Sequence, residues 1–147
     1  MKKFYLFIII LLLSLNSLYA EKEEHVFILN SYHPDFRWTM MEVSGIRSAF
    51  MYNSYKGTLY VEYLDTKNFS FEENEKIYFD LFKRKYKNFN FKVVVVTDND
   101  AFYFVNKYKK DLFPNSSVVF CGVNGFSEDM IPDRKYYTGV VERNNYE

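Results

Sequence analysis

Polar side chains that can bind or activate a small molecule recur at four points of the sequence, each directly after an apolar run. Asparagine, serine and tyrosine side chains can hydrogen-bond a ligand, and a histidine beside an aspartate can act as a general base. Aspartates also cap helices, asparagines also satisfy loop backbone, and Trp38 can pack on a helix, so each residue has a structural alternative. The candidate ligand-binding residues are Asn30, Ser31, Tyr32, His33, Trp38, Asp65, Asp98, Asp100 and Asn124.

The run before Asp98 shows what positions these residues. It contains four consecutive valines, Val93 to Val96, and then changes abruptly to Thr97, Asp98, Asn99 and Asp100. An unbroken apolar run of this length suits a strand covered on both faces, as in a parallel sheet. The carboxyl ends of parallel strands border the ligand crevice of such sheets. We call this rim of the sheet the carboxyl edge.

The same pattern of strand, polar end and helix repeats along the chain. Strands are predicted at residues 26–29, 58–64, 91–97, 118–122 and 137–142, and residues 127–131 form at most one or two helical turns. Capping boxes at Thr39/Glu42 and Ser70/Glu73 predict two helix starts, and Pro114 ends a third helix. The sequence therefore predicts an α/β fold with an open parallel five-stranded sheet, order 2-1-3-4-5, and helices on both faces. The apolar helix faces are expected to be Val43, Ile46, Ala49 and Phe50; Ile77, Leu81 and Phe82; and Ala101, Val105, Tyr108 and Leu112.

The first twenty residues have the layout of a secretory signal peptide. Lys2 and Lys3 precede an uninterrupted apolar run, which becomes more polar before Ala20. The run is shorter than the ~20 residues of a membrane span. We expect cleavage after Ala20 and export to the periplasm, with an uncleaved inner-membrane anchor as the alternative. Residues 21–147 then form one α/β ligand-binding lobe.

Composition argues against several classes of function. Basic and acidic residues number 19 each, and without Lys2 and Lys3 the net charge is near −2, which gives no support for nucleic-acid binding. Cys121 is the single cysteine, in an apolar run typical of a small buried hydrophobe, and His25 and His33 lack ligand spacing. There is no glycine-rich phosphate loop. We expect neither a metal nor a cofactor.

Catalysis needs a nucleophile with a base, or two carboxylates at a working distance. Asp98 and Asp100 are two residues apart at a helix start, so we expect one to cap the helix and the other to face the carboxyl edge. His33 with Asp65 or Asp98 is the best catalytic arrangement that the sequence offers. A small secreted hydrolase using His33 and an aspartate of the edge is therefore the alternative to a binding protein.

Several segments together resemble a known family. They are residues 26–34 with Trp38, residues 63–67, residues 97–101, residues 111–114 and residues 119–124. In this order they are similar to the substrate-binding proteins of ABC transporters, of the type I periplasmic-binding-protein fold. The closest likeness is to the versions that form extracytoplasmic sensor regions of bacterial histidine kinases and diguanylate cyclases.

The resemblance implies a non-catalytic protein that binds or senses a small solute by closing two lobes on it. It covers the amino-terminal lobe, so we expect the second lobe to be absent from this sequence. A membrane permease or a sensor kinase would then be the partner, and any kinase or cyclase activity would lie in a missing carboxy-terminal part. A non-functional gene fragment is a further alternative.

Overall fold

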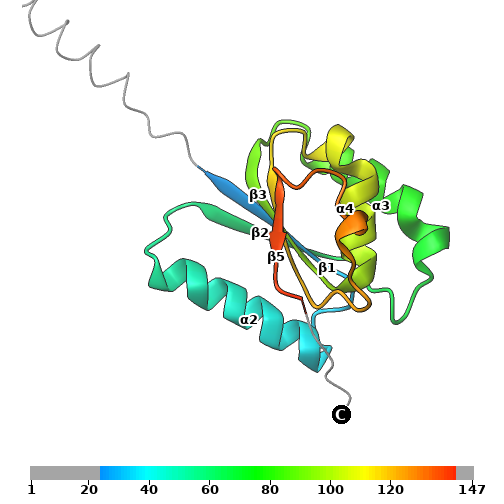
Figure 1. Ribbon diagram of the computed structural model, residues 1–147, viewed down its shortest axis with the longest axis horizontal. Coiled ribbons are helices and arrows are strands. Elements are labelled where there is room, and N and C mark those ends of the chain that lie inside the picture. The colour runs from blue at the N-terminus through cyan, green and yellow to red at the C-terminus, as the bar shows by residue number, and fades with distance from the viewer. Residues whose placement is uncertain (1–23, 142–147) are drawn as a thin grey trace, which may run out of the picture.

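The computed structural model describes residues 24–141, so the predicted signal peptide lies outside the described residues. Within this range the chain alternates strands and helices (Figure 1). The elements are β1 (His25–Asn30), α2 (Arg37–Tyr52), β2 (Thr58–Tyr63), α3 (Phe71–Lys85), β3 (Phe91–Thr97), α4 (Asp98–Leu112), β4 (Ser117–Cys121), the 3-10 turn η2 (Glu128–Met130) and β5 (Tyr137–Gly139).

The five described strands form one open sheet in the order β2-β1-β3-β4-β5, and every pairing is parallel. The predicted α/β fold and strand order are therefore confirmed. In the register, Asn30 at the end of β1 pairs with Tyr63 of β2 and with Thr97 of β3. The carboxyl ends of the central strands thus lie level with one another, which brings the segments after them to one edge.

The valine strand β3 sends alternate side chains to two separate apolar clusters. Val94 and Val96 join the main core, which α3 and α4 complete with Phe82, Phe102 and other aromatic residues. Val95 joins a smaller cluster on the opposite face, under α2. Figure 1 shows this arrangement, with α2 alone on one face and with α3 and α4 together on the other. The prediction of helices on both faces is correct.

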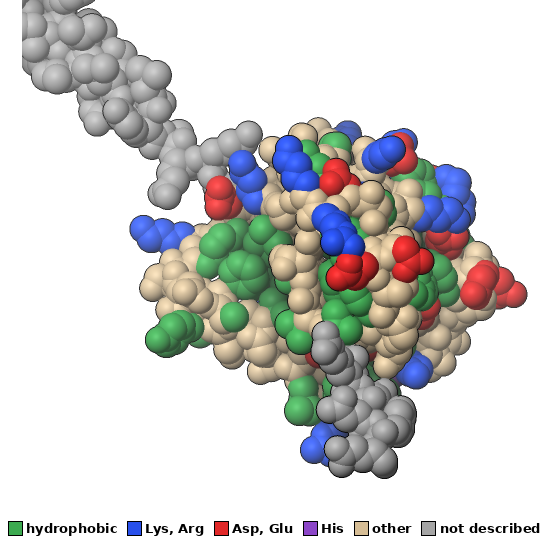
Figure 2. Space-filling view, viewed as in Figure 1, with side chains coloured by type: hydrophobic (Ala, Val, Ile, Leu, Met, Phe, Trp, Pro, Cys, Tyr) green, Lys and Arg blue, Asp and Glu red, His purple; other side chains and the backbone are tan. Residues whose placement is uncertain are grey.

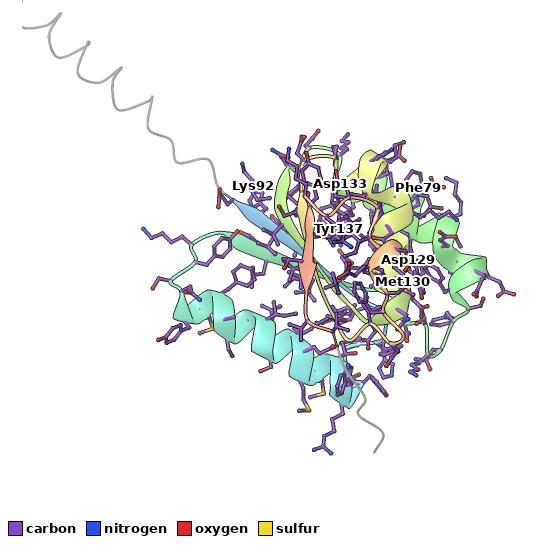
Figure 3. All side chains as sticks on the ribbon, in the orientation of Figure 1. Phe79, Lys92, Asp129, Met130, Asp133 and Tyr137 are labelled. Atoms are coloured by element: carbon purple, nitrogen blue, oxygen red, sulfur yellow. The ribbon has the colours of Figure 1, made fainter. Side chains whose placement is uncertain are left out.

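The loop after β4 closes the core on the α4 side. In Figure 3, Met130 of η2 lies beside α4 and Tyr137 lies on β5. The Asn106 side chain of α4 donates to the Met130 carbonyl at 3.1 Å. Burial raises the pKa of Tyr137 to about 12, which fits a phenol enclosed at the sheet margin.

One of the two predicted capping boxes, Thr39/Glu42, does not form the start of a helix. Helix α2 starts at Arg37, before Thr39, and its cap residue Phe36 makes no side-chain capping bond. Thr39 is fully buried and Glu42 partly buried, because both lie on the side of α2 that faces the sheet. The start of α3 is as predicted, since Ser70 Oγ accepts the Glu73 amide at 3.3 Å.

The predicted apolar face of α3 is also partly wrong. Phe82 is buried, but Ile77 is 62% exposed and Leu81 is 39% exposed. Tyr78 and Phe79 pack on the core in their place. Aromatic rings supply more contact area than the two aliphatic side chains, and they turn the helix so that Ile77 and Leu81 face solvent. The predicted face of α4 is correct, with Ala101 and Val105 fully buried.

Candidate functional site

The carboxyl edge collects the polar segments that follow β1, β2, β3 and β4. Hydrogen bonds tie three of these segments to one another. Ser31 accepts the Thr66 amide on its carbonyl at 2.9 Å, and the Thr66 hydroxyl donates to Asp100 Oδ2 at 2.5 Å. The segments after β1, β2 and β3 therefore form one connected structure.

Asn30 and Ser31 hold this edge together from inside. Both are fully buried. The Asn30 amide donates to the Glu62 carbonyl at 3.1 Å, and its oxygen accepts the Thr97 hydroxyl at 3.1 Å. These contacts engage the Asn30 side chain within the sheet, so any effect of Asn30 on a ligand passes through the position of its neighbours.

The amino terminus of α4 is capped by a residue distant in sequence. Ser31 Oγ accepts the Ala101 amide at 2.9 Å and donates to the Thr97 carbonyl at 2.8 Å. Ser31, the residue after β1, therefore supplies a side-chain cap that the sequence predicted from Asp98 or Asp100, and the cap residue Thr97 makes no side-chain capping bond of its own. Asp100 instead bonds Thr66.

Asp98 occupies an unusual position at the start of α4. It is 3% exposed and its φ is +64°, in the left-handed region that side chains other than glycine rarely adopt. Left-handed residues cost free energy and cluster at functional sites, where surrounding structure holds them in place. Asp65 shares a positive φ, so burial is what sets Asp98 apart from the other aspartates of the edge.

Glu42 of α2 joins Asp98 at the edge, and the sequence interpretation missed its role. A Cβ atom built at Gly122 would lie 2.9 Å from Glu42 Oε1 and 3.0 Å from Asp98 Oδ1. Both carboxyl groups thus lie against the same glycine, which follows β4 with a φ of +68°. A larger residue at Gly122 would collide with both groups.

The environment of Glu42 favours its protonated form. Burial and the nearby Asp98 charge raise the pKa of Glu42 to about 7, and side-chain hydrogen bonds with Trp38, Cys121 and Thr97 partly oppose this effect. The Cys121 thiol lies 3.8 Å from Glu42 Oε1, while Glu42 Oε2 is buried without a hydrogen-bond partner. A neighbouring carboxylate disfavours ionisation, so Glu42 is partly protonated near neutral pH.

Aromatic rings and a lysine border the carboxyl pair. Burial and the charges of Asp98, Asp100 and Glu42 raise the pKa of Tyr32, which places its phenol within the field of all three carboxylates. The ring of Tyr32 packs on Phe36 with centroids 5.2 Å apart, and the Lys67 ammonium lies 4.5 Å from the Tyr32 centroid. The site is thus acidic and lined on one side by aromatic surface that already attracts a cation.

The remaining predicted residues lie around this centre. Trp38 is on the first turn of α2 and is partly exposed. Asp65, with a φ of +54°, accepts the Asn68 amide at 2.8 Å in a local turn after β2. Asn124 is held by Asn99, whose side chain bonds both its backbone amide, at 3.0 Å, and its carbonyl, at 3.1 Å.

His33 lies in the loop between β1 and α2, with its ring 5.9 Å from the ring of Phe36. The two aspartates outside the buried pair are engaged elsewhere, Asp65 with Asn68 and Asp100 with Thr66. The catalytic pairing of His33 with Asp65 or Asp98 stays a prediction.

The class of protein is defined by the fold and by the carboxyl edge. Among residues 24–141, no group of three or more histidine, cysteine, aspartate or glutamate side chains is arranged to hold a metal ion. None of the helices in that range is long and apolar enough to cross a membrane. No protein-family model, curated protein or solved structure matches the chain. The class that the structure defines is thus an α/β domain with an acidic site at the carboxyl edge of its sheet.

Proposed function

We propose that this chain is a small-molecule binding or sensing domain that acts without catalysis, and that its ligand binds at the carboxyl edge. One observation carries the proposal: Glu42 and Asp98, from two different helices, converge against Gly122 at the strand ends. Buried like charges oppose folding, and perturbed carboxyl groups of this kind are concentrated at functional sites. The location also fits the general position of ligands in open parallel sheets.

The charges at the site indicate which ligand group it favours. The charges of Glu42, Asp98 and Asp100 together raise the pKa of Tyr32. The same negative field would attract the ammonium group of a ligand. An ammonium placed between Glu42 and Asp98 would stabilise both ionised carboxylates. The Tyr32 and Trp38 rings would add cation–π attraction. We therefore propose that the ligand presents an amine or another cationic group to this site.

The family resemblance adds the wider setting of the proposal. Substrate-binding proteins of ABC transporters and the related sensor regions enclose a solute between two lobes, and here the carboxyl edge would be one wall of such a site. Export through the amino-terminal segment, and a permease or sensor kinase as partner, belong to the same proposal. The strand order 2-1-3-4-5 is compatible with it, although many doubly wound folds share that order.

Calorimetric titration of the full chain tests the proposal with three small probes: ethanolamine, glycine and acetate. We expect the two amine-bearing probes to bind and acetate not to bind.

Because Glu42 would lose its proton when an ammonium binds, binding at pH 6 should release protons, and the measured heat should vary with the ionisation enthalpy of the buffer. Asp98→Asn should weaken amine binding, whereas Glu73→Gln, an exposed change on α3, should leave it unchanged. Equal binding of amines by the Asp98→Asn variant would contradict the proposed site.

A further inference from the structure

A second surface, distinct from the carboxyl edge, is the side of α2 that faces away from the sheet. Helix α2 has three charged residues among sixteen, whereas α3 has eight among fifteen. Helices that are apolar around most of their circumference are normally enclosed by other elements. Yet Thr39 is the one buried residue of α2. This helix is therefore unusually apolar for its exposure.

The residues of this side follow from helical geometry. Thr39, Ile46 and Phe50 face the sheet, since Thr39 is fully buried and the other two pack on the smaller cluster. At 3.6 residues per turn, the opposite side begins with the exposed Arg37 in the first turn and then carries the six residues that we call the α2 outer face. They are Met40, Met41, Ser44, Ser48, Met51 and Tyr52.

The α2 outer face is exposed and carries no carboxylate. Its large side chains lie at the two ends, and small side chains lie between them. Its four large side chains, at the two ends, are 55%, 62%, 78% and 89% exposed in chain order. Its centre holds the two serines, and a Cβ built at the adjoining Gly45 would meet nothing within 4 Å. Figure 2 shows hydrophobic side chains in green near both ends of α2 and mainly tan surface, which marks other side chains and the backbone, between them. A groove of about 420 Å³ runs along one side, between Met40, Met51 and Tyr63 of β2.

We propose that the α2 outer face binds the same face of a second copy of this chain. The two helices run antiparallel, and the twofold axis crosses the outer face at the level of Ile46 along the helix. From that level, the six residues of the outer face follow the same order of small and then large side chains in both directions. Met40 and Met41 lie about 8 Å along the helix on one side of it, and Met51 and Tyr52 about 8 Å on the other. Ser44 and Ser48 are each about 3 Å from it.

The twofold arrangement brings complementary shapes together. The large side chains at one end of each helix pack on those at the opposite end of its partner, while the serines meet at the centre. Small residues there let helix axes approach to the short end of the usual 8–10 Å. A self-complementary patch is what a twofold dimer requires. The helix is only about 24 Å long, so the contact is smaller than the ~800 Å² per partner of a standard interface, and the dimer is expected to be weak.

Cysteine cross-linking of the full chain tests the register directly. In a Cys121→Ala background, Ser44→Cys and Ser48→Cys are made as separate variants. In the proposed dimer residue 44 faces residue 48 of the other copy, within the 4.4–6.8 Å Cα separation that a disulfide needs, while like residues are about 6 Å further apart along the axis. Mild oxidation of the mixed variants should therefore give several-fold more covalent dimer than oxidation of either variant alone. A mixture of Ile77→Cys and Leu81→Cys, on the exposed side of α3, serves as the matched control.

Sedimentation equilibrium provides the second measurement. Met51→Lys should weaken self-association by at least tenfold, while Ile77→Lys, the same kind of change on α3, should not affect it. A full chain that stays monomeric at several hundred micromolar would overturn the proposal. Association with equal cross-linking of all mixtures, or association that survives Met51→Lys, would overturn it as well, since the copies would then meet through another surface.

Discussion

Replacing Glu42 by glutamine should stabilise the protein at alkaline pH and have much less effect in acid. The pKa of Glu42 is raised from 4.5 to about 7 by burial and by Asp98. The folded state therefore binds more protons than the unfolded state between these values. The stabilising contribution of the protonated side chain is fully present below pH 4.5 and is lost as the pH rises through about 7.

The size of this effect follows from the shift. One pKa unit corresponds to about 1.4 kcal/mol of folding free energy. Because Glu42 is partly exposed, solvent screening reduces the contribution of the whole shift to about 1–2 kcal/mol. Glutamine keeps the shape and the hydrogen-bonding oxygen but never ionises. The free energy of unfolding of Glu42→Gln, taken relative to that of the unchanged protein, should therefore be about 1–2 kcal/mol higher at pH 8 than at pH 4.5.

Urea denaturation of both proteins at pH 4.5, 6, 7 and 8 measures this difference, since the contributions of the other titrating groups largely cancel. Glu73→Gln, an exposed glutamate in the first turn of α3, controls for the loss of any one carboxylate. Asp98→Asn should move the midpoint of the Glu42 effect to lower pH, because it removes one of the two causes of the raised pKa. A stability difference that does not change from pH 4.5 to 8 would refute the reasoning and show that Glu42 titrates as an ordinary exposed carboxylate.

Three further changes test the positions that build the carboxyl edge. Ser31→Ala should lower the free energy of unfolding by about 1–3 kcal/mol, since it removes the cap of α4 and a buried hydrogen bond; urea denaturation that shows no loss would mean that the cap is replaced. Gly122→Ala should cost more than Gly125→Ala, because both glycines have positive φ but only Gly122 lies against the two carboxyl groups; equal losses in the same measurement would mean that the carboxyl groups move aside freely. Val94→Asp should cost several kcal/mol and Ile77→Asp little, as one side chain is fully buried and the other exposed; similar midpoints of thermal unfolding would contradict the assignment of faces.

The fold was predictable because its signals are local and repeated. Four consecutive valines, polar residues after each strand and helical spacing between strands determine an α/β sheet with little ambiguity. Errors arose where two local signals compete. Thr39 and Glu42 have the spacing of a capping box, but the chain continues the helix to Arg37 so that both residues face the sheet. Ile77 and Leu81 have the spacing of a core face, but aromatic neighbours occupy the core.

The candidate site was predictable in place more than in detail. Parallel strands bring their polar ends to one edge whatever the residues are, which is why Tyr32, Asp98 and Asp100 come together. The internal partners of these residues depend on the register between strands. Ser31 caps a helix seventy residues away in sequence, and only the pairing of β1 with β3 brings the two together.

Glu42 illustrates both the limit of sequence reasoning and the signal that was present. It lies three residues after Thr39 and four before Ile46, on the side of α2 that packs on the sheet. A carboxylate on the apolar side of a helix is costly unless something compensates it. In this structure Asp98 adds to that cost, and the side-chain hydrogen bonds with Trp38, Cys121 and Thr97 offset it in part. A charge that folding penalises, placed beside the ends of β3 and β4, is the reason to test this edge first for the cationic ligand that we propose.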